Sequence, residues 1–166
     1  MGELRQGAYR EVTDRGPKTE EAVPVAPSPR PPNHVVVRWR GDETFEGGRP
    51  GGPAVLVDGH GKAAQSPVDV VLTGLASCSS IDVVGILAKR RTPVQSLEVE
   101  VVGERANDRV PRKLVRIVLT FHIVGAGIER EHAERAIDLA VTKYCSVRDS
   151  LDPTIPVEWK LELRDA

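Results

Sequence analysis

The stretch that decides the fold is residues 66–91, which read SPVDVVLTGLASCSSIDVVGILAKRR. Ser66 is a suitable N-cap, Pro67 fits the first position of a helix, and Asp69 stands where a capping box places its acidic residue. The three basic residues at the end complement the negative pole of a helix. We therefore expect a helix over 67–91. Because its interior is apolar on nearly every side, we expect this helix to be deeply buried.

The region before this helix has the alternation of β-strands. From His34 onward, apolar side chains recur at every second position. Glycine-rich breaks at 41–42 and 47–52 interrupt the pattern, and an apolar run resumes at 54–57. The sequence thus predicts three short strands ahead of the helix.

After the helix, the chain changes period twice. Residues 97–101 and 115–123 alternate apolar and polar side chains, which predicts two half-solvated strands in a hairpin. Residues 129–145 carry alanine and aliphatic side chains at helical spacing, which predicts a second helix. Residues 155–163 form a last amphipathic strand. The expected order β-β-β-α-β-β-α-β is that of an α+β fold.

The N-terminal part has a different composition from the rest. Residues 1–33 hold six of the 13 prolines and show no apolar period. We expect a flexible arm there, followed by a single domain over 34–166. A proline-rich arm can also serve as a docking segment for a partner.

Composition excludes several classes of function. The 23 basic and 24 acidic residues give a formal net charge of -1, which provides no field to attract nucleic acid or an anionic membrane. Aromatic residues make up only 4%, too few for a platform on which bases stack. No stretch approaches the roughly 20 apolar residues of a membrane helix, and the N-terminus lacks the apolar part of a secretory signal. We expect a cytoplasmic protein without nucleic-acid or membrane partners.

The two cysteines, Cys78 and Cys145, are too few for a disulfide framework. We therefore expect them to take part in a reaction rather than to stabilise the fold. A thiolate is a good nucleophile, and a second thiol nearby traps the sulfenate that oxidation produces. Each cysteine could instead be a small buried apolar residue, or the two could form a structural disulfide. The four histidines lack metal-ligand spacing, so we expect neither a metal nor another cofactor.

The segment SPVDVVLTGLASCSSIDVVGIL around Cys78 and the later KYCSV around Cys145 resemble the paired cysteine signature of the OsmC/Ohr family. The resemblance covers roughly residues 34–166, and the expected element order agrees with it. The residues that follow both cysteines resemble the OsmC-like branch more than the hydroperoxide-resistance branch. The resemblance implies an OsmC-like two-layer fold with a long central helix, in an intertwined homodimer.

The resemblance also implies a thiol peroxidase. Cys78 would attack a hydroperoxide and become a sulfenic acid, and Cys145 would condense with it to a disulfide. An external dithiol, such as the lipoyl group of a protein, would then restore both thiols. Neither cysteine needs a metal for this chemistry.

Activation of Cys78 requires a further group. Cys78 lies about three turns into its helix, where the helix dipole has faded, and burial raises the pKa of a thiol. We therefore expect a cation beside it, which in the family is an arginine near the N-terminal strands. Arg49, after a Gly-Gly pair, is the first candidate, and Arg38 and Arg40 are alternatives. Each could equally be a solvated surface charge.

In the family a carboxylate near the start of the cysteine helix holds this arginine. Hydroperoxide reductases of the family have Glu directly after the proline, where this sequence has Val68. Asp69 is the candidate replacement, and it could also serve only as a helix cap. Asp82, one turn beyond Cys78, needs a partner of its own if it is buried. The missing Glu favours an alternative function, a non-catalytic redox sensor or small-ligand-binding dimer.

Overall fold

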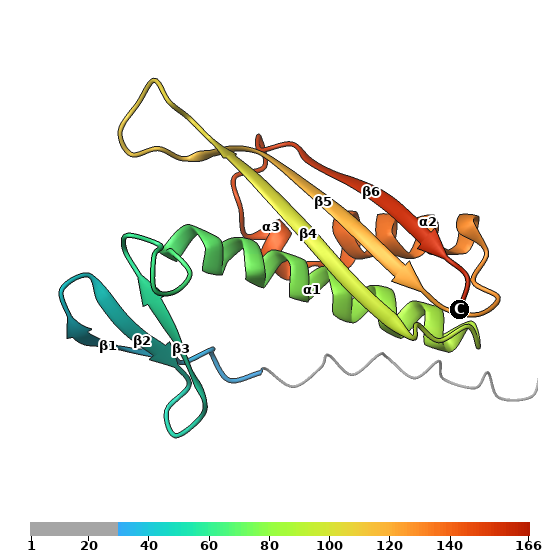
Figure 1. Ribbon diagram of the computed structural model, residues 1–166, viewed down its shortest axis with the longest axis horizontal. Helices are drawn as coiled ribbons and strands as arrows, with labels where there is room; N and C mark the ends of the chain where they lie inside the picture. The colour runs from blue at the N-terminus through green and yellow to red at the C-terminus, as the bar shows by residue number, and fades with distance from the viewer. Residues whose placement is uncertain (1–29) are drawn as a thin grey trace, which may run out of the picture. The chain divides into compact units, whose positions relative to one another are not determined.

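The computed structural model describes residues 30–166, which fold into two three-stranded sheets and a group of helices (Figure 1). The first sheet contains β1 (Val36–Gly41), β2 (Thr44–Gly48) and β3 (Ala54–Asp58). The second contains β4 (Ser96–Arg105), β5 (Leu114–Val124) and β6 (Val157–Arg164). The helical segments are α1 (Pro67–Lys89), α2 (Arg130–Leu139), η1 (Ala140–Tyr144) and α3 (Ser146–Asp149). The expected α+β class is confirmed, whereas the arm predicted over residues 1–33 lies outside the described residues up to residue 29.

The first sheet is an antiparallel meander in the order β1-β2-β3, as the glycine breaks predicted. Its last strand ends at Asp58, a buried carboxylate. Asp58 accepts hydrogen bonds from the backbone N–H groups of His60, Lys62 and Ala63 at 2.8–3.0 Å. These bonds lower the pKa of Asp58 and order the loop that leads into α1.

The capping box predicted for α1 is present. The Ser66 hydroxyl accepts a hydrogen bond from the Asp69 N–H, and the Asp69 carboxylate accepts one from the Ser66 N–H at 2.9 Å. The helix ends at Lys89, and Arg91 follows in the left-handed region with φ 65°. Local sequence therefore fixes both ends of the longest helix.

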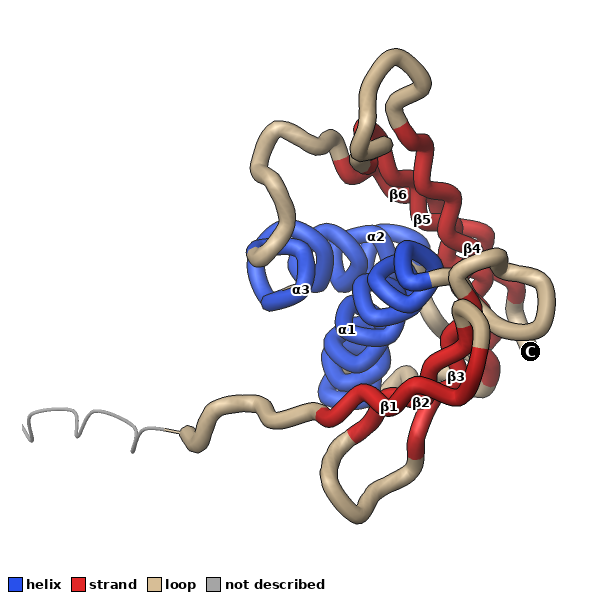
Figure 2. The backbone as a smooth tube through the Cα atoms, turned by 90° about the vertical axis from the view of Figure 1, so that its left-hand side faces the viewer, coloured by secondary structure: helices blue, strands red, loops and turns tan. Residues whose placement is uncertain are grey.

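The second sheet has the order β4-β5-β6 and combines two kinds of pairing. β4 and β5 form the predicted antiparallel hairpin, with Val99 opposite Phe121. β6 pairs with β5 in parallel, with Leu119 opposite Trp159. A parallel neighbour needs a crossover connection, and the helical segments from α2 to α3 provide it. Figure 2 shows α1 and α2 on the same side of this sheet.

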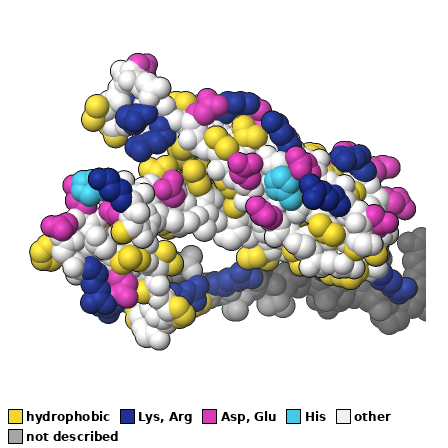
Figure 3. All heavy atoms as spheres, viewed as in Figure 1, with side chains coloured by type: hydrophobic (Ala, Val, Ile, Leu, Met, Phe, Trp, Pro, Cys, Tyr) yellow, Lys and Arg dark blue, Asp and Glu magenta, His cyan; other side chains and the backbone are white. Residues whose placement is uncertain are grey.

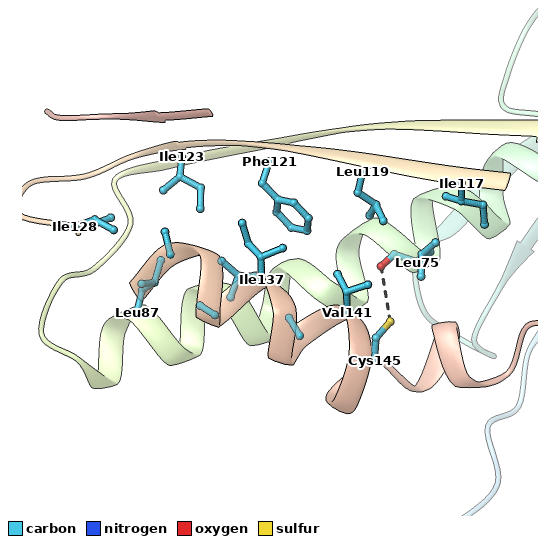
Figure 4. Close-up of a cluster of buried hydrophobic side chains, with 14 of the residues drawn as sticks. Leu75, Leu87, Ile117, Leu119, Phe121, Ile123, Ile128, Ile137, Val141 and Cys145 are labelled. Atoms are coloured by element: carbon cyan, nitrogen blue, oxygen red, sulfur yellow. Dashed lines mark hydrogen bonds between the residues drawn. The ribbon is translucent and has the colours of Figure 1, made fainter. Parts of the chain in front are cut away.

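The hydrophobic core lies between the second sheet and the helices (Figure 4). Alternate residues of β5 point inward and are at most 1% exposed, namely Ile117, Leu119, Phe121 and Ile123. They meet fully buried residues of α1 and α2, namely Leu75, Val83, Leu87, Ala133, Ala136 and Ile137. Burial of a side chain of this size stabilises a fold by roughly 1.5–3 kcal/mol, so this layer anchors both helices.

The outer face of the second sheet is charged. Arg116 bridges Glu104 and Glu158 across the three strands at 2.7–2.8 Å, and His122 lies 3.0 Å from Glu162. Figure 3 shows acidic and basic side chains interspersed over this region. This mixture agrees with the absence of a single-sign field inferred from composition.

The expected deep burial of α1 is wrong for the single chain. Its buried residues, Leu75, Ser79, Val83 and Leu87, form one line along the helix that faces the core. On other sides Ile81 is 73% exposed, and Val71 and Val84 are each 41% exposed. The described chain covers one face of this apolar helix, against which the second sheet and the α2–α3 crossover pack.

The expectation that no segment approaches a membrane helix is also wrong. By length and composition alone α1 could cross a membrane: it has 23 residues and an 18-residue window of mean hydropathy 1.9. The expectation failed because glycine, serine and threonine interrupt the aliphatic runs yet cost little in hydropathy. The core helix of a domain passes the same test, and α1 contributes to the core described above.

The second helix predicted over 129–145 is in fact interrupted. It becomes a π-helical turn at Ala140, where the Cys145 N–H bonds to the Ala140 carbonyl five residues back, at 3.0 Å. Ala140 and Val141 in this turn are 0% and 3% exposed. A regular period of 3.6 residues does not predict the hydrogen bond that spans five residues here. Cys145 is then extended, with φ −72° and ψ 99°, and α3 begins after it.

Candidate functional site

The structure brings the two cysteines together. Cys78 lies in the middle of α1, and Cys145 connects η1 to α3. Both thiols are free, and each is among the groups that shift the pKa of the other. The Cys78 Sγ also lies 3.9 Å from the Ser146 Oγ. Two side chains far apart in the sequence thus form one dithiol site.

Cys145 is held in a defined position. Its Sγ caps α3 by accepting a hydrogen bond from the Arg148 N–H at 3.3 Å. The same Sγ lies 3.9 Å from the Leu75 carbonyl oxygen of α1, as the dashed line in Figure 4 shows. Only 3% of Cys145 is exposed. Both helices therefore fix the direction of this thiol.

Cys78 has the features of the more reactive thiol. Burial raises its pKa, but hydrogen bonds from the Val147 N–H, the Cys145 thiol, and the hydroxyl and N–H of Ser146 lower it more. The net pKa of Cys78 is below that of an ordinary thiol. Since the thiolate is the nucleophile, the lowered pKa makes Cys78 the candidate attacking thiol.

Cys145 shifts in the opposite direction. Burial is the largest influence and raises its pKa. Hydrogen bonds from Ser79 and Arg148 lower the pKa, while the neighbouring Cys78 raises it again. The net pKa of Cys145 is above the ordinary value, so the pair contains one activated and one protonated thiol.

The expectation of a cation beside Cys78 stays a prediction. No arginine is among the groups with the largest effects on the pKa of Cys78 in residues 30–166. The sequence argument considered only the dipole of α1 itself, in which Cys78 is central. The groups that lower the pKa of Cys78 come from a different segment: the Val147 N–H, the Cys145 thiol, and the hydroxyl and N–H of Ser146.

The candidate arginines lie on the first sheet and its turns. Arg49 is exposed in the turn after β2, where its carbonyl accepts the Gly52 N–H at 3.0 Å. Its side chain has no hydrogen bond or ion pair with the described residues. Arg40 pairs with Glu46 across the β1–β2 hairpin, and Arg38 is exposed on the same strand. Their roles toward Cys78 stay predictions.

The candidate carboxylate Asp69 acts as a helix cap. Hydrogen bonds from the hydroxyl and N–H of Ser66 lower the pKa of Asp69, and the charge of Arg105 lowers it further. Nine residues separate Asp69 from Cys78, which is about 13.5 Å along a helix and about 180° around it. Asp82, one turn after Cys78, is half-buried and has no hydrogen bond within the described residues.

Comparison with known proteins identifies the family. Residues 59–160 match the family described as OsmC-like protein. Protein YhfA from Escherichia coli K12 is 37% identical over 128 residues, which span 76% of this chain and 95% of that protein. The chain belongs to the OsmC family. The resemblance noted around both cysteines is thereby confirmed.

Solved structures with the OsmC fold agree with this assignment. An OsmC-like protein from Mycoplasma pneumoniae superimposes with a TM-score of 0.68 at 16% identity, covering 78% of this chain and 95% of that one. An organic hydroperoxide resistance protein from Legionella pneumophila gives a TM-score of 0.61 at 14% identity, covering 80% and 99%. At these identities the likeness shows a shared fold.

The sequence argument missed several groups of this OsmC-family site. Ser79 is fully buried, its hydroxyl donates to the Leu75 carbonyl at 3.1 Å, and it lowers the pKa of Cys145. Its position in an apolar helix marked it only as a small residue. Val147 acts on Cys78 through its backbone N–H, and Ser146 acts through its hydroxyl and, to a smaller extent, its N–H. Both residues belong to the KYCSV motif, so the motif itself was the available signal.

Proposed function

We propose that this OsmC-family protein reduces hydroperoxides with Cys78 and Cys145. One observation carries the proposal: two free thiols lie close enough to affect each other's pKa, and their pKa values are shifted in opposite directions. A nucleophile with a lowered pKa beside a protonated partner is the arrangement that a two-cysteine reduction needs. Related folds that include a protein named for organic hydroperoxide resistance are consistent with this chemistry.

The reaction proceeds in two steps. The Cys78 thiolate attacks one peroxide oxygen, the O–O bond breaks, and the alcohol leaves after taking a proton, so that Cys78 becomes a sulfenic acid. The Cys145 sulfur then attacks the Cys78 sulfur, water leaves, and a disulfide forms. An external dithiol, such as the lipoyl group of a protein, returns both cysteines to thiols. The cytoplasm, which keeps thiols reduced, is the proposed compartment.

Stoichiometric oxidation tests the proposal. Fully reduced protein is mixed with cumene hydroperoxide without any reductant, and peroxide loss, free thiols and disulfide peptides are measured. We expect one peroxide consumed and one Cys78–Cys145 disulfide formed per chain. The Cys78→Ser variant should consume no peroxide. The Cys145→Ser variant should form the Cys78 sulfenic acid but no disulfide, and excess peroxide should then oxidise this sulfenic acid further. If the protein shows no catalytic turnover of peroxide with any of dithiothreitol, dihydrolipoamide and thioredoxin, the proposal that it is an enzyme is rejected.

A second function, redox sensing, has a specific observation in its favour. Val68 occupies the place of the family Glu, and the pKa of Cys78 depends chiefly on hydrogen bonds rather than on an arginine within residues 30–166. A sensor would form the same disulfide once but turn over slowly. Rapid first oxidation without sustained peroxide consumption would therefore indicate a sensor.

The proposal includes a homodimer. The open side of α1 exposes Ile81, and the first sheet exposes Val37 and Trp39 at 64% and 68%. Apolar surfaces of this kind mark interaction sites in proteins that fold around one core. A second copy of the chain that covers α1 would bury the apolar side chains that the single chain leaves open. This interface would also bring groups from the partner toward Cys78.

A further inference from the structure

The Ser146 hydroxyl lies beside the sulfur of Cys78. The two atoms are 3.9 Å apart, and within residues 30–166 Cys78 is the one hydrogen-bond partner of this hydroxyl. Ser146 directly follows Cys145 and begins α3, which packs against α1. Ser146 is exposed, whereas Cys145 is only 3% exposed. An oxidant that reaches Cys78 from solvent can therefore contact this O–H group.

The donors around Cys78 differ in their freedom to move. The N–H groups of Ser146 and Val147 belong to the backbone of α3, which fixes their direction. The Ser146 hydroxyl rotates about its Cβ–Oγ bond and can turn from the sulfur to another acceptor. Of these donors, only the hydroxyl can follow a negative charge that moves from sulfur to oxygen.

The charged donors of the same segment are directed elsewhere. The Arg148 guanidinium donates to the Ile155 carbonyl at 3.2 Å. The Lys143 ammonium lies over the ring of Tyr144, 5.6 Å from its centroid. Among these side chains, the Ser146 hydroxyl is the one that contacts the Cys78 sulfur.

Reduction of a hydroperoxide needs such a donor. When a thiolate attacks the terminal oxygen, negative charge develops on the second oxygen, which leaves as an alkoxide. An alkoxide is a poor leaving group unless a proton reaches it as the O–O bond breaks. A positioned general acid accelerates such a step by roughly 10²–10⁴-fold.

We infer that Ser146 is a catalytic residue whose hydroxyl protonates the alkoxide that leaves when Cys78 reduces a hydroperoxide. The inference rests on the function proposed above and adds the source of the proton. Before the reaction, the hydroxyl donates its hydrogen bond to the Cys78 thiolate. As the O–O bond breaks, this hydrogen bond moves from the sulfur to the departing oxygen.

The bonds and charges balance with water as the co-reactant. The Cys78 sulfur bonds to the terminal oxygen and is oxidised by two electrons to the sulfenic acid, whose hydrogen comes from the hydroperoxide. The O–O bond breaks, and its electron pair leaves on the second oxygen. That oxygen takes the proton of the Ser146 hydroxyl and becomes the alcohol. The serine oxygen then takes a proton from water, which becomes hydroxide, and the exposure of Ser146 gives water access to it.

The leaving group distinguishes this role from a general effect on Cys78. Cumene hydroperoxide expels an alkoxide and needs the proton. Peracetic acid presents the same kind of O–O bond but expels acetate, a stable anion that needs no proton to leave. Loss of a general acid should therefore slow the first oxidant and spare the second. A disturbed fold or a less nucleophilic thiolate would slow both.

The test compares both oxidants on wild type, Ser146→Ala and Ser146→Thr, at a pH where both oxidants are neutral. Reduced protein is mixed with oxidant and quenched with N-ethylmaleimide, and unreacted Cys78 is counted by peptide mass spectrometry. Each rate is divided by the thiolate fraction of that variant, taken from iodoacetamide labelling across a pH series. We expect Ser146→Ala to lose at least about tenfold with cumene hydroperoxide and less than about twofold with peracetic acid. Ser146→Thr keeps the hydroxyl and should recover most of the lost rate.

A second serine at the end of α3 provides the matched control. The Ser150 hydroxyl donates to the Ser146 carbonyl at 2.8 Å, so Ser150→Ala disturbs α3 without removing the proton donor. It should leave the ratio of the two rates within about twofold of wild type. Equal slowing of both oxidants in Ser146→Ala, or a Ser146→Thr variant as slow as Ser146→Ala with cumene hydroperoxide, would overturn the inference. A wild type that reacts with peracetic acid but not with cumene hydroperoxide would instead contradict the proposed peroxidase.

Discussion

At the scale of single residues, backbone donors distinguish two chemically identical side chains. Cys78 receives hydrogen bonds from the residues that follow Cys145, while Cys145 is buried against α1. Each hydrogen bond to a charged group is worth roughly 1.5–3 kcal/mol, enough to outweigh partial burial. Within the described residues, these contacts shift the pKa values of the two thiols in opposite directions.

The two thiols should titrate separately. The pKa of Cys78 is lowered, so its thiolate forms at lower pH, and that of Cys145 is raised, so its thiolate forms at higher pH. Iodoacetamide labelling across a pH series, read by peptide mass spectrometry, should give a lower midpoint for Cys78. Protein unfolded in guanidinium serves as the control, in which both midpoints should converge. Coinciding midpoints in the native protein would contradict the assignment.

Removal of one backbone donor should raise the pKa of Cys78. Val147→Pro deletes the N–H that bonds Cys78 and places proline in the first turn of α3, where it is tolerated. The labelling rate of Cys78 at pH 7 should fall several-fold. The matched variant Val147→Ala shortens the same side chain but keeps the N–H, and circular dichroism verifies that both variants fold. If Val147→Ala slows labelling equally, packing rather than the N–H controls Cys78.

At the scale of elements, the ends of the helices position the site. The capping box sets where α1 begins, and so which of its residues face the core. The π-turn of η1 sets where Cys145 emerges and allows α3 to start directly after it. π-Turns inside helices often accompany functional sites, and here the turn precedes a site residue.

Asp69 should matter more for stability than for chemistry. Loss of a cap costs about 1 kcal/mol, so Ser66→Ala and Asp69→Ala should each lower the free energy of unfolding by that order in urea titrations. Because the pKa of Asp69 is lowered from 3.8, its contribution is complete above that value and is lost as the pH falls through the lowered pKa.

The pair Ser66→Ala and Asp69→Ala also tests the predicted role of Asp69 as the holder of an arginine. Both variants break the same capping box, yet only Asp69→Ala removes the carboxylate. We expect similar rates of peroxide reduction in the two. A rate at least tenfold lower in Asp69→Ala than in Ser66→Ala would show that the carboxylate serves the site.

At the scale of the whole molecule, the described chain leaves apolar surface open on α1 and on the first sheet. The core uses one side of α1, although the helix is apolar on nearly every side. A second copy is the proposed cover. Residues such as Asp82 on the Cys78 face would then be enclosed, and their partners would come from the other chain.

A charged side chain introduced on the open side of α1 should dissociate the proposed dimer into single chains. Ile81 is 73% exposed, so Ile81→Glu should spare the core and yet place two carboxylates in the interface. Sedimentation at micromolar concentration should show wild type near twice the chain mass of 18.0 kDa and the variant near that mass. The control Val110→Glu, at a loop residue 94% exposed, should remain dimeric. A monomeric wild type would contradict the homodimer.

The sequence by itself determined the elements that depend on neighbours along the chain. Capping at Ser66, strand alternation at 97–101 and glycine breaks in the first sheet are local signals, and each led to the element that the structure contains. The KYCSV motif also identified the second cysteine. Local periods missed η1, because the apolar spacing of residues 129–145 does not signal the Cys145 N–H bond to the Ala140 carbonyl that defines this turn.

Only the tertiary structure decided which groups surround the thiols. The N–H donors to Cys78 come from residues nearly 70 positions away, and which face of α1 they meet depends on how α1, η1 and α3 pack. The same packing leaves Ile81 open and buries Ser79. Hydrogen bonds and burial between distant segments follow from the three-dimensional path of the chain, whereas composition and period describe only what lies close along it.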